Sequence, residues 1–103
     1  MLAIVVNKID NVATALSEIM AGSIPAVLVL DKDAYVRMRE TIPMGHKFAI
    51  RIIEKEVIKY GEIIGVATCT IEAGEYVHTH NVKSLRGRGD LLDSTISDEE
   101  AEI

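Results

Sequence analysis

The sequence predicts a mainly β fold, and three observations support this prediction. Short runs rich in Val, Ile and Ala recur along the chain, with Gly, Pro and Asn between them. These runs do not alternate with helices in the way that a parallel, doubly wound sheet requires. The chain has 103 residues, of which 49% are hydrophobic, so it suits one domain with an aliphatic core.

Several apolar segments are strand candidates. The run LAIVV at 2–6 is rich in β-branched residues, which favours a buried strand. The run IPAVLVL at 24–30 predicts a second strand, in which Pro25 is tolerated only at the start. A short strand is expected at 35–39, and the alternating run FAIRII at 48–53 predicts another.

One helix is expected between the first two strands, over residues 10–22. Asp10 or Asn11 can cap it, since a side-chain oxygen of either residue can accept a bond from a free backbone N–H group. Apolar residues then recur on one helical face, and Gly22 ends the segment. Such a short helix needs packing on a sheet to be stable.

The rest of the chain is expected to form short β segments followed by a tail. Glycine residues divide the segment after residue 53 into strand-length pieces. Cys69 lies in an alternating run, so we expect a small buried side chain rather than a catalytic thiol. Residues 86–103 lose the hydrophobic period and end in acidic residues. The chain therefore divides into a domain at 1–85 and a flexible tail at 86–103.

Composition excludes several classes of function. With a net charge of −5 and 4% aromatic residues, neither counterion release nor base stacking supports nucleic-acid binding. The single cysteine excludes an internal disulfide and a cysteine-cluster zinc site. No apolar run approaches the roughly 20 residues of a membrane span, and no signal-peptide pattern opens the chain. A soluble cytoplasmic protein is expected.

His78 and His80 are the first candidates for chemistry. On a strand, residues two apart point to the same face, about 7 Å from each other, so two imidazoles would lie side by side with Thr79 opposite. Such a pair can ligate a metal, move protons or, when protonated, bind a carboxylate. A metal would need at least a third ligand, which the sequence does not locate. The spacing alone favours a solvated or structurally hydrogen-bonded pair.

His46 and Lys47 are the second candidates. They follow Gly45, and a glycine turn exposes backbone N–H groups, so the segment suits an anion such as a carboxylate. From spacing alone, an ordinary exposed loop is the simpler interpretation. Tyr60, ahead of Gly61, is either a hydrogen-bond donor or acid–base group or a cover for the edge of the core. No GxSxG, P-loop, GxGxxG or HExxH motif occurs, so a partner chain is expected to supply part of any catalytic site.

Three longer motifs resemble one known family. They are P-x-G-H-K at 43–47, V-I-K-Y-G-x-x-I-G-x-A at 57–67 and A-G-E-x-V-H-x-H-N at 73–81. In this order they resemble the small N-terminal module of the altronate/galactarate dehydratase family of sugar-acid hydro-lyases, and the likeness runs from about residue 8 to residue 90. The resemblance implies a SAF-type β-clip, with short bent strands, long hairpins and one or two short helices.

The resemblance also implies a partner, a reaction and a cofactor. The module works beside a much larger catalytic portion, either fused to it or as a separate chain. The reaction implied is loss of water from a sugar acid such as altronate or galactarate, giving a 2-keto-3-deoxy acid. In the related sulfolactate sulfo-lyase, sulfite leaves instead. A divalent metal, iron(II) or manganese(II), is expected, held mainly in the complex with the large subunit.

On this interpretation the chain is the small subunit of a two-chain hydro-lyase and is inactive without the large subunit. His78 and His80 are expected to be metal ligands or acid–base groups at a site shared with that subunit. Asn81 is expected to orient the substrate or to hold an imidazole tautomer, and His46 with Lys47 to bind the substrate carboxylate. Two alternatives stay open, namely a sulfolactate sulfo-lyase small subunit and a non-catalytic carbohydrate-binding SAF module. A homo-oligomer and the identity of the hydroxy acid are also left open.

Overall fold

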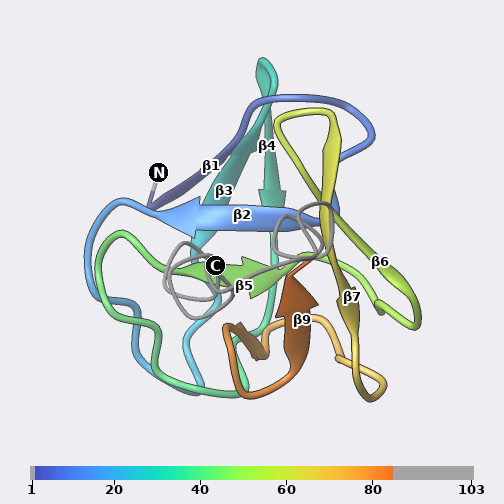
Figure 1. Cartoon of the computed structure of the whole chain (residues 1–103). Coiled ribbons are helices and arrows are strands. Elements are labelled where there is room, and N and C mark those ends of the chain that lie inside the picture. The colour runs from blue at the N-terminus through green and yellow to red at the C-terminus, as the bar shows by residue number, and fades with distance from the viewer. Residues whose placement is uncertain (1, 85–103) are drawn as a thin grey trace.

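The computed structural model describes residues 2–84, which fold into strands arranged in two sheets (Figure 1). The strands are β1 (Ala3–Val5), β2 (Val12–Ala15), β3 (Ala26–Val29), β4 (Lys32–Tyr35), β5 (Lys47–Ala49), β6 (Glu56–Lys59), β7 (Glu62–Ala67), β8 (Tyr76–Val77) and β9 (Val82–Ser84). The mainly β prediction is confirmed. The expected tail at 86–103 lies outside the described residues, and within 2–84 no helix is long and apolar enough to cross a membrane.

The larger sheet has the strand order β4-β3-β1-β2-β5-β8, and the smaller sheet has the order β6-β7-β9. Strands β1 and β3 run parallel, and the other pairs in the described residues are antiparallel. In Figure 1, β2 and β5 lie side by side near the centre, and the β6–β7 hairpin stands beside them. Strand β8 is therefore an edge strand of the larger sheet, next to β5.

Two apolar clusters cover opposite faces of the larger sheet, because neighbouring residues of a strand point to opposite faces. On β2 and β5, Ala13 and Phe48 belong to the first cluster, whereas Val12 and Ala49 belong to the second. The second cluster also contains side chains from β6, β8 and β9, so it joins the two sheets. Both faces of β5 are thus buried, and this strand forms a fixed base for the residues at its start.

The helix expected over 10–22 is wrong, and no helix occurs in the described residues. Residues 12–15 instead form β2, which pairs with β1 and β5. The segment ends in a single antiparallel bridge between Ile19 and Ile42. Pairing with two neighbouring strands satisfies the backbone and buries both faces of the segment, and this outweighs a marginal local tendency to form a helix.

Asp10 and Asn11 hold the β6–β7 hairpin instead of capping a helix. The buried Asp10 carboxylate accepts hydrogen bonds from the backbone N–H groups of Tyr60 and Gly61, at 3.0 and 2.8 Å. The Asn11 amide accepts from Ile58 N and donates to the Glu56 carbonyl, both at 2.8 Å. Tyr60 and Gly61 both have positive φ, as the tight two-residue turn between β6 and β7 requires.

Other expectations are met in part. Pro25 directly precedes β3, as predicted, and the strands expected at 2–6, 24–30 and 48–53 appear as β1, β3 and β5. The strand expected at 35–39 lies earlier, at 32–35, as β4. The expectation of a buried Cys69 is wrong. Strand β7 ends at Ala67, and the chain bends outward, which leaves the thiol exposed.

Candidate functional site

The pairing of β5 with β8 brings His46 and His78 together. Lys47 lies opposite Val77 in this antiparallel pair, so the residues just beyond, His46 and His78, stand across from each other. Their ring centroids are 5.2 Å apart, with the ring planes at 62°. Two histidines separated by 32 positions in the sequence therefore meet at one end of the β5–β8 pair.

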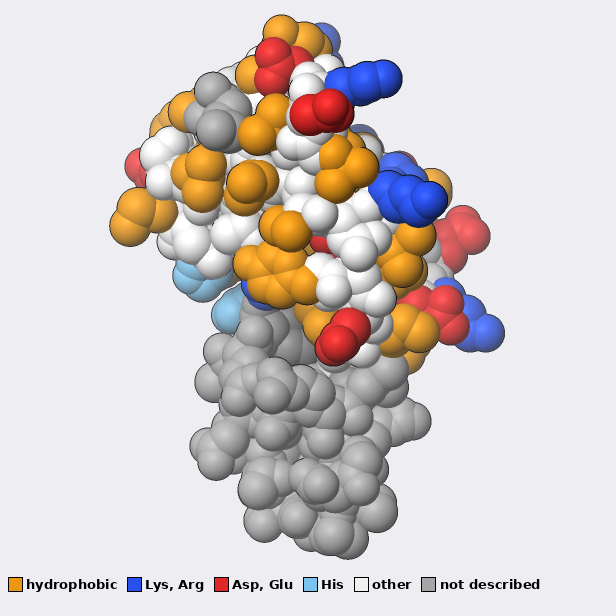
Figure 2. Space-filling view, turned by 90° about the horizontal axis from the view of Figure 1, so that it is seen from above, with side chains coloured by type: hydrophobic (Ala, Val, Ile, Leu, Met, Phe, Trp, Pro, Cys, Tyr) orange, Lys and Arg blue, Asp and Glu red, His pale blue; other side chains and the backbone are white. Residues whose placement is uncertain are grey.

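Tyr76 completes this group of rings. Its hydroxyl oxygen lies 2.6 Å from Nδ1 of His46, and its ring stacks on that of His78 with the centroids 5.4 Å apart and the planes 3° apart. The ring of His80 lies 5.5 Å from the Tyr76 ring, tilted by 51°. We call His46, Tyr76, His78 and His80 the imidazole cluster. Figure 2 shows histidine side chains, in pale blue, at the surface of the described part of the protein.

His78 and His80 do not lie on a continuous strand, so the expected strand geometry is wrong. Strand β8 ends at Val77, and residues 78–81 form a turn closed by a hydrogen bond from Asn81 N to the His78 carbonyl at 3.1 Å. The turn leaves His78 half-buried and His80 and Thr79 exposed. Both imidazoles nevertheless lie against Tyr76, because the turn folds His80 back toward that ring.

Asn81 holds this turn in place. Its amide oxygen accepts from the backbone N–H of His78 at 3.0 Å, and its amide nitrogen donates to the Tyr76 carbonyl at 2.8 Å. The residue is buried, with 6% of its surface exposed. Asn81 therefore fixes the backbone around the two histidines. The direct substrate contact expected from the sequence stays a prediction.

Lys47 points away from the imidazole cluster. It is opposite Val77, which belongs to the second apolar cluster, whereas Tyr76 packs against the first cluster. His46 and Lys47 thus face opposite sides of β5, which argues against their binding one carboxylate together. The expected free N–H groups are also absent, since Gly45 N and His46 N donate to the carbonyls of Ala15 and Pro43.

The Lys47 side chain is buried, with 3% of its surface exposed, and this burial lowers its pKa to about 8. The positive charge of Lys59 on β6 contributes to the same shift. Between pH 8 and about 10.5 the unfolded chain binds the proton more tightly than the folded chain, so stability rises with pH across this window. Below pH 8 the whole cost of burying the charge is present.

We expect Lys47→Met to be more stable than the wild type at pH 6.5, because methionine fills the site without a charge. This advantage should shrink by about 2 kcal/mol by pH 9.5, as wild-type Lys47 loses its proton. Urea unfolding midpoints at the two pH values test this, and the exposed Lys83→Met is the matched control. A constant advantage at both pH values would contradict the prediction.

The described residues do not form a complete metal site. Within residues 2–84, no three His, Cys, Asp or Glu side chains come together in a way that could hold a metal ion. Moreover, Nδ1 of His46 already contacts the Tyr76 hydroxyl. The ligand role expected for His78 and His80 would therefore need further donors from outside residues 2–84.

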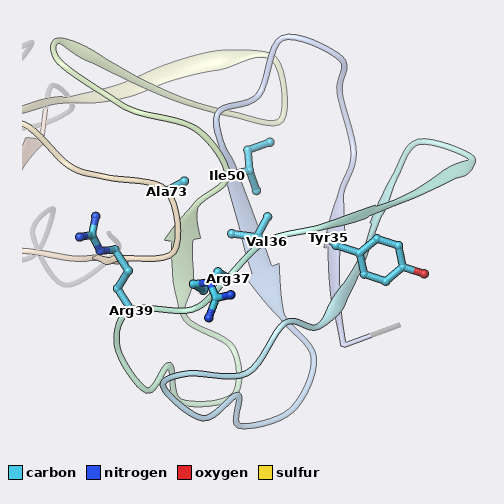
Figure 3. A pocket seen from close by; sticks show the side chains of 6 residues that line it. All are labelled: Tyr35, Val36, Arg37, Arg39, Ile50 and Ala73. Atoms are coloured by element: carbon cyan, nitrogen blue, oxygen red, sulfur yellow. The ribbon is translucent and has the colours of Figure 1, made fainter.

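A separate cavity of about 340 Å³ lies beside β4. Figure 3 shows the residues that line it, which are Tyr35, Val36, Arg37, Arg39, Ile50 and Ala73. The two exposed guanidinium groups suit an anion, and Arg39 already lies 4.0 Å from Glu72. The lining has no histidine or carboxylate that could exchange a proton near neutral pH. The imidazole cluster is therefore the better candidate for chemistry.

Tyr60 is the tyrosine that the sequence singles out, whereas the structure places Tyr76 among the histidines. Tyr60 lies in the exposed β6–β7 turn, where the Lys59 ammonium is 4.7 Å from its ring centroid. Tyr76 could have been found, because it lies two residues before His78, and alternate strand residues share a face. The convergence of His46 on the same place depends on strand register, which no local pattern reveals.

The fold and the cluster define a small all-β module that carries three imidazoles and a phenol at the end of one strand pair. The chain belongs to the altronate/galactarate dehydratase SAF domain family, whose model matches residues 1–85. The SAF-type β-clip expected from the sequence is thus confirmed in its all-β form, and residues 2–84 contain none of the expected helices.

Relatives of two kinds match the chain. It is 40% identical over 81 residues to altronate dehydratase of Escherichia coli (strain K12), which covers 77% of this chain but only 16% of that enzyme. It is 41% identical over 70 residues to (2R)-sulfolactate sulfo-lyase subunit alpha of Chromohalobacter salexigens, covering 64% of this chain and 74% of that subunit. For the same subunit of Paracoccus pantotrophus, identity is 40% over 58 residues, or 54% of this chain and 87% of the relative.

Proposed function

We propose that this chain is the small subunit of a two-chain lyase that eliminates water from a sugar acid such as altronate or galactarate to give a 2-keto-3-deoxy acid. The imidazole cluster carries the proposal. Three imidazoles and a phenol gather at the end of an edge strand, with His80 exposed and His46 and His78 half-buried. A larger catalytic chain would complete the site, and the chain alone would be inactive.

The elimination needs proton transfer at two places. A base removes the proton next to the carboxylate, the electron pair left behind forms a carbon–carbon double bond, and the neighbouring C–O bond breaks. The departing hydroxide takes up a proton and leaves as water, and the enol product becomes the 2-keto acid. Imidazoles suit both transfers, because they gain and lose protons near neutral pH. We assign this work to His78 and His80, with His46 as a donor to the substrate.

The small chain cannot easily enclose a substrate by itself. His80 and Thr79 are exposed, and the cluster lies at the edge of the larger sheet rather than in the cavity beside β4. A hydroxy acid bound there would stay in contact with water, which weakens electrostatic interactions with a developing charge. A partner chain covering β8 would exclude that water. It would also provide the metal ligands that residues 2–84 do not supply.

A sulfo-lyase is the second candidate. Two relatives named as sulfo-lyase subunit alpha match over 74% and 87% of their own length, whereas the match to altronate dehydratase covers 16% of that enzyme. A small subunit of this kind would use the same proton removal, with a C–S bond breaking and sulfite leaving instead of water. A carbohydrate-binding module without chemistry is the third candidate.

The test is to co-express this chain with a candidate large catalytic chain from the same genome, purify through a tag on the small chain, and offer altronate, galactarate and sulfolactate. We expect the two chains to co-purify and to release a 2-keto acid without sulfite. Release of sulfite would identify the sulfo-lyase instead. A stable complex without turnover of any of these acids would favour the binding module. Failure to co-purify would overturn the small-subunit proposal.

A further inference from the structure

Tyr76 is the side chain that contacts all three histidines of the chain. Its hydroxyl lies against Nδ1 of His46, its ring face lies against His78, and His80 lies beside the same ring. His46 and Tyr76 also meet edge to face, with centroids 5.6 Å apart and planes at 64°. Removing this one ring would take away the side chain that all three histidines contact.

The backbone of Tyr76 is fixed on both sides. Its N–H group donates to Oε2 of Glu40 at 3.2 Å, and its carbonyl accepts from the amide of Asn81 at 2.8 Å. Its ring packs against the first apolar cluster, and Phe48 lies opposite it across the β5–β8 pair. A phenol held in this way has little freedom to move its hydroxyl away from His46.

We propose that Tyr76 is the positioning residue of the imidazole cluster, whose hydroxyl donates to Nδ1 of His46 and so directs the remaining proton of that ring to Nε2. A neutral imidazole has one N–H group and one acceptor nitrogen, and a phenol is a better donor than acceptor. At 2.6 Å the O–H···N contact is short. His46 therefore presents Nε2–H as a hydrogen-bond donor to a carboxylate or hydroxyl group.

This assignment deepens the proposed function, on which it rests for the class of ligand, a hydroxy acid. It does not rest on that function for the hydrogen bond itself. The sequence suggested that His46 and Lys47 bind a carboxylate together, but Lys47 faces the other side of β5. The tautomer set by Tyr76 lets His46 contribute to that task without Lys47.

Tyr76→Phe tests the inference, because it removes the hydroxyl and keeps the ring that stacks on His78. Nitrogen NMR of the full chain at a fixed pH of 7.5 should show the wild-type His46 with its proton on Nε2. In Tyr76→Phe we expect a mixture in which the Nδ1–H form appears. Tyr60→Phe, in the exposed turn, is the matched control and should leave the His46 signals unchanged. Unchanged His46 signals in Tyr76→Phe would overturn the inference.

A second readout uses the two-chain complex. Loss of the fixed Nε2–H donor should raise KM for the hydroxy acid by about tenfold, the fold-change that corresponds to one hydrogen bond, with kcat changed less than KM. An unchanged KM in a complex that turns over its substrate would overturn the ligand-binding part of the inference. The NMR result is independent of turnover. A complex that lacks activity would therefore count against the proposed function, whereas the NMR spectra would still test the Tyr76–His46 hydrogen bond.

Discussion

Replacing His78 with alanine is expected to lower turnover of the proposed two-chain lyase by about 100- to 10,000-fold, the usual contribution of a positioned acid or base. Three contacts hold His78 in the cluster. It stacks on Tyr76, faces His46 across the strand pair, and its backbone N–H is bound by Asn81. His80→Ala is expected to act in the same direction, since His80 is exposed where a partner chain would complete the site.

Thr79→Ala is the control for both histidine variants. Thr79 is exposed between the two histidines in the same turn. Thr79→Ala therefore truncates a side chain of the same backbone segment without removing an imidazole. Turnover is measured after gel filtration has shown that each variant still forms the complex, which separates chemistry from assembly. Near wild-type turnover in both His78→Ala and His80→Ala would show that the cluster does not take part in the reaction.

Gly74→Ala is expected to lower the free energy of unfolding by about 4 kcal/mol, near the upper end for single substitutions. At this residue the backbone crosses the segment that follows β4, with hydrogen bonds from Arg39 N to the Gly74 carbonyl and from Gly74 N to the Ala49 carbonyl. A Cβ atom there would overlap the carbonyl oxygen of Arg37 and come within 3.1 Å of Arg39 N. Both are backbone atoms that cannot rotate away, so the two segments would have to separate.

Gly45→Ala separates this overlap from backbone strain. Gly45 has φ +84° and Gly74 has φ +88°, so alanine is strained to a similar degree at both positions, yet a Cβ atom at Gly45 meets nothing within 4 Å. Gly45→Ala should therefore cost only about 1–2 kcal/mol. Thermal and urea unfolding of the two variants measure the difference. Equal losses would mean that the two crossing segments can separate at Gly74 at little cost in free energy.

Much of the fold could be predicted from the sequence, because strand signals are local. The apolar runs that became β1 and β3, and the position of Pro25 ahead of β3, follow from residue type and order alone. The helix prediction for the segment 10–22 is wrong because the two capping residues that indicate it bond to another part of the chain. Asp10 and Asn11 bond to backbone groups 45 to 51 positions away, and no local rule includes such partners.

The candidate site could be predicted only in part for the same reason. His78 and His80 are close in sequence, so their spacing alone makes them candidates, although it predicts a strand where the structure has a turn. His46 meets them through the register of β5 with β8, and Lys47 is turned away by the alternation of that same strand. The family resemblance points to His46, Lys47, His78 and His80. Only the three-dimensional contacts show that the three histidines meet and that Lys47 does not.

The Asp10–Asn11 attachment of the β6–β7 hairpin also bears on how the chain folds. A hairpin with a two-residue loop forms within about 1–10 μs, since its contacts are local. Docking it onto Asp10 and Asn11 requires closure of loops of 45 to 51 residues before any of those bonds can form. Small β proteins that depend on such non-local contacts fold on the order of milliseconds to seconds. The hairpin therefore forms well before it is attached to Asp10 and Asn11.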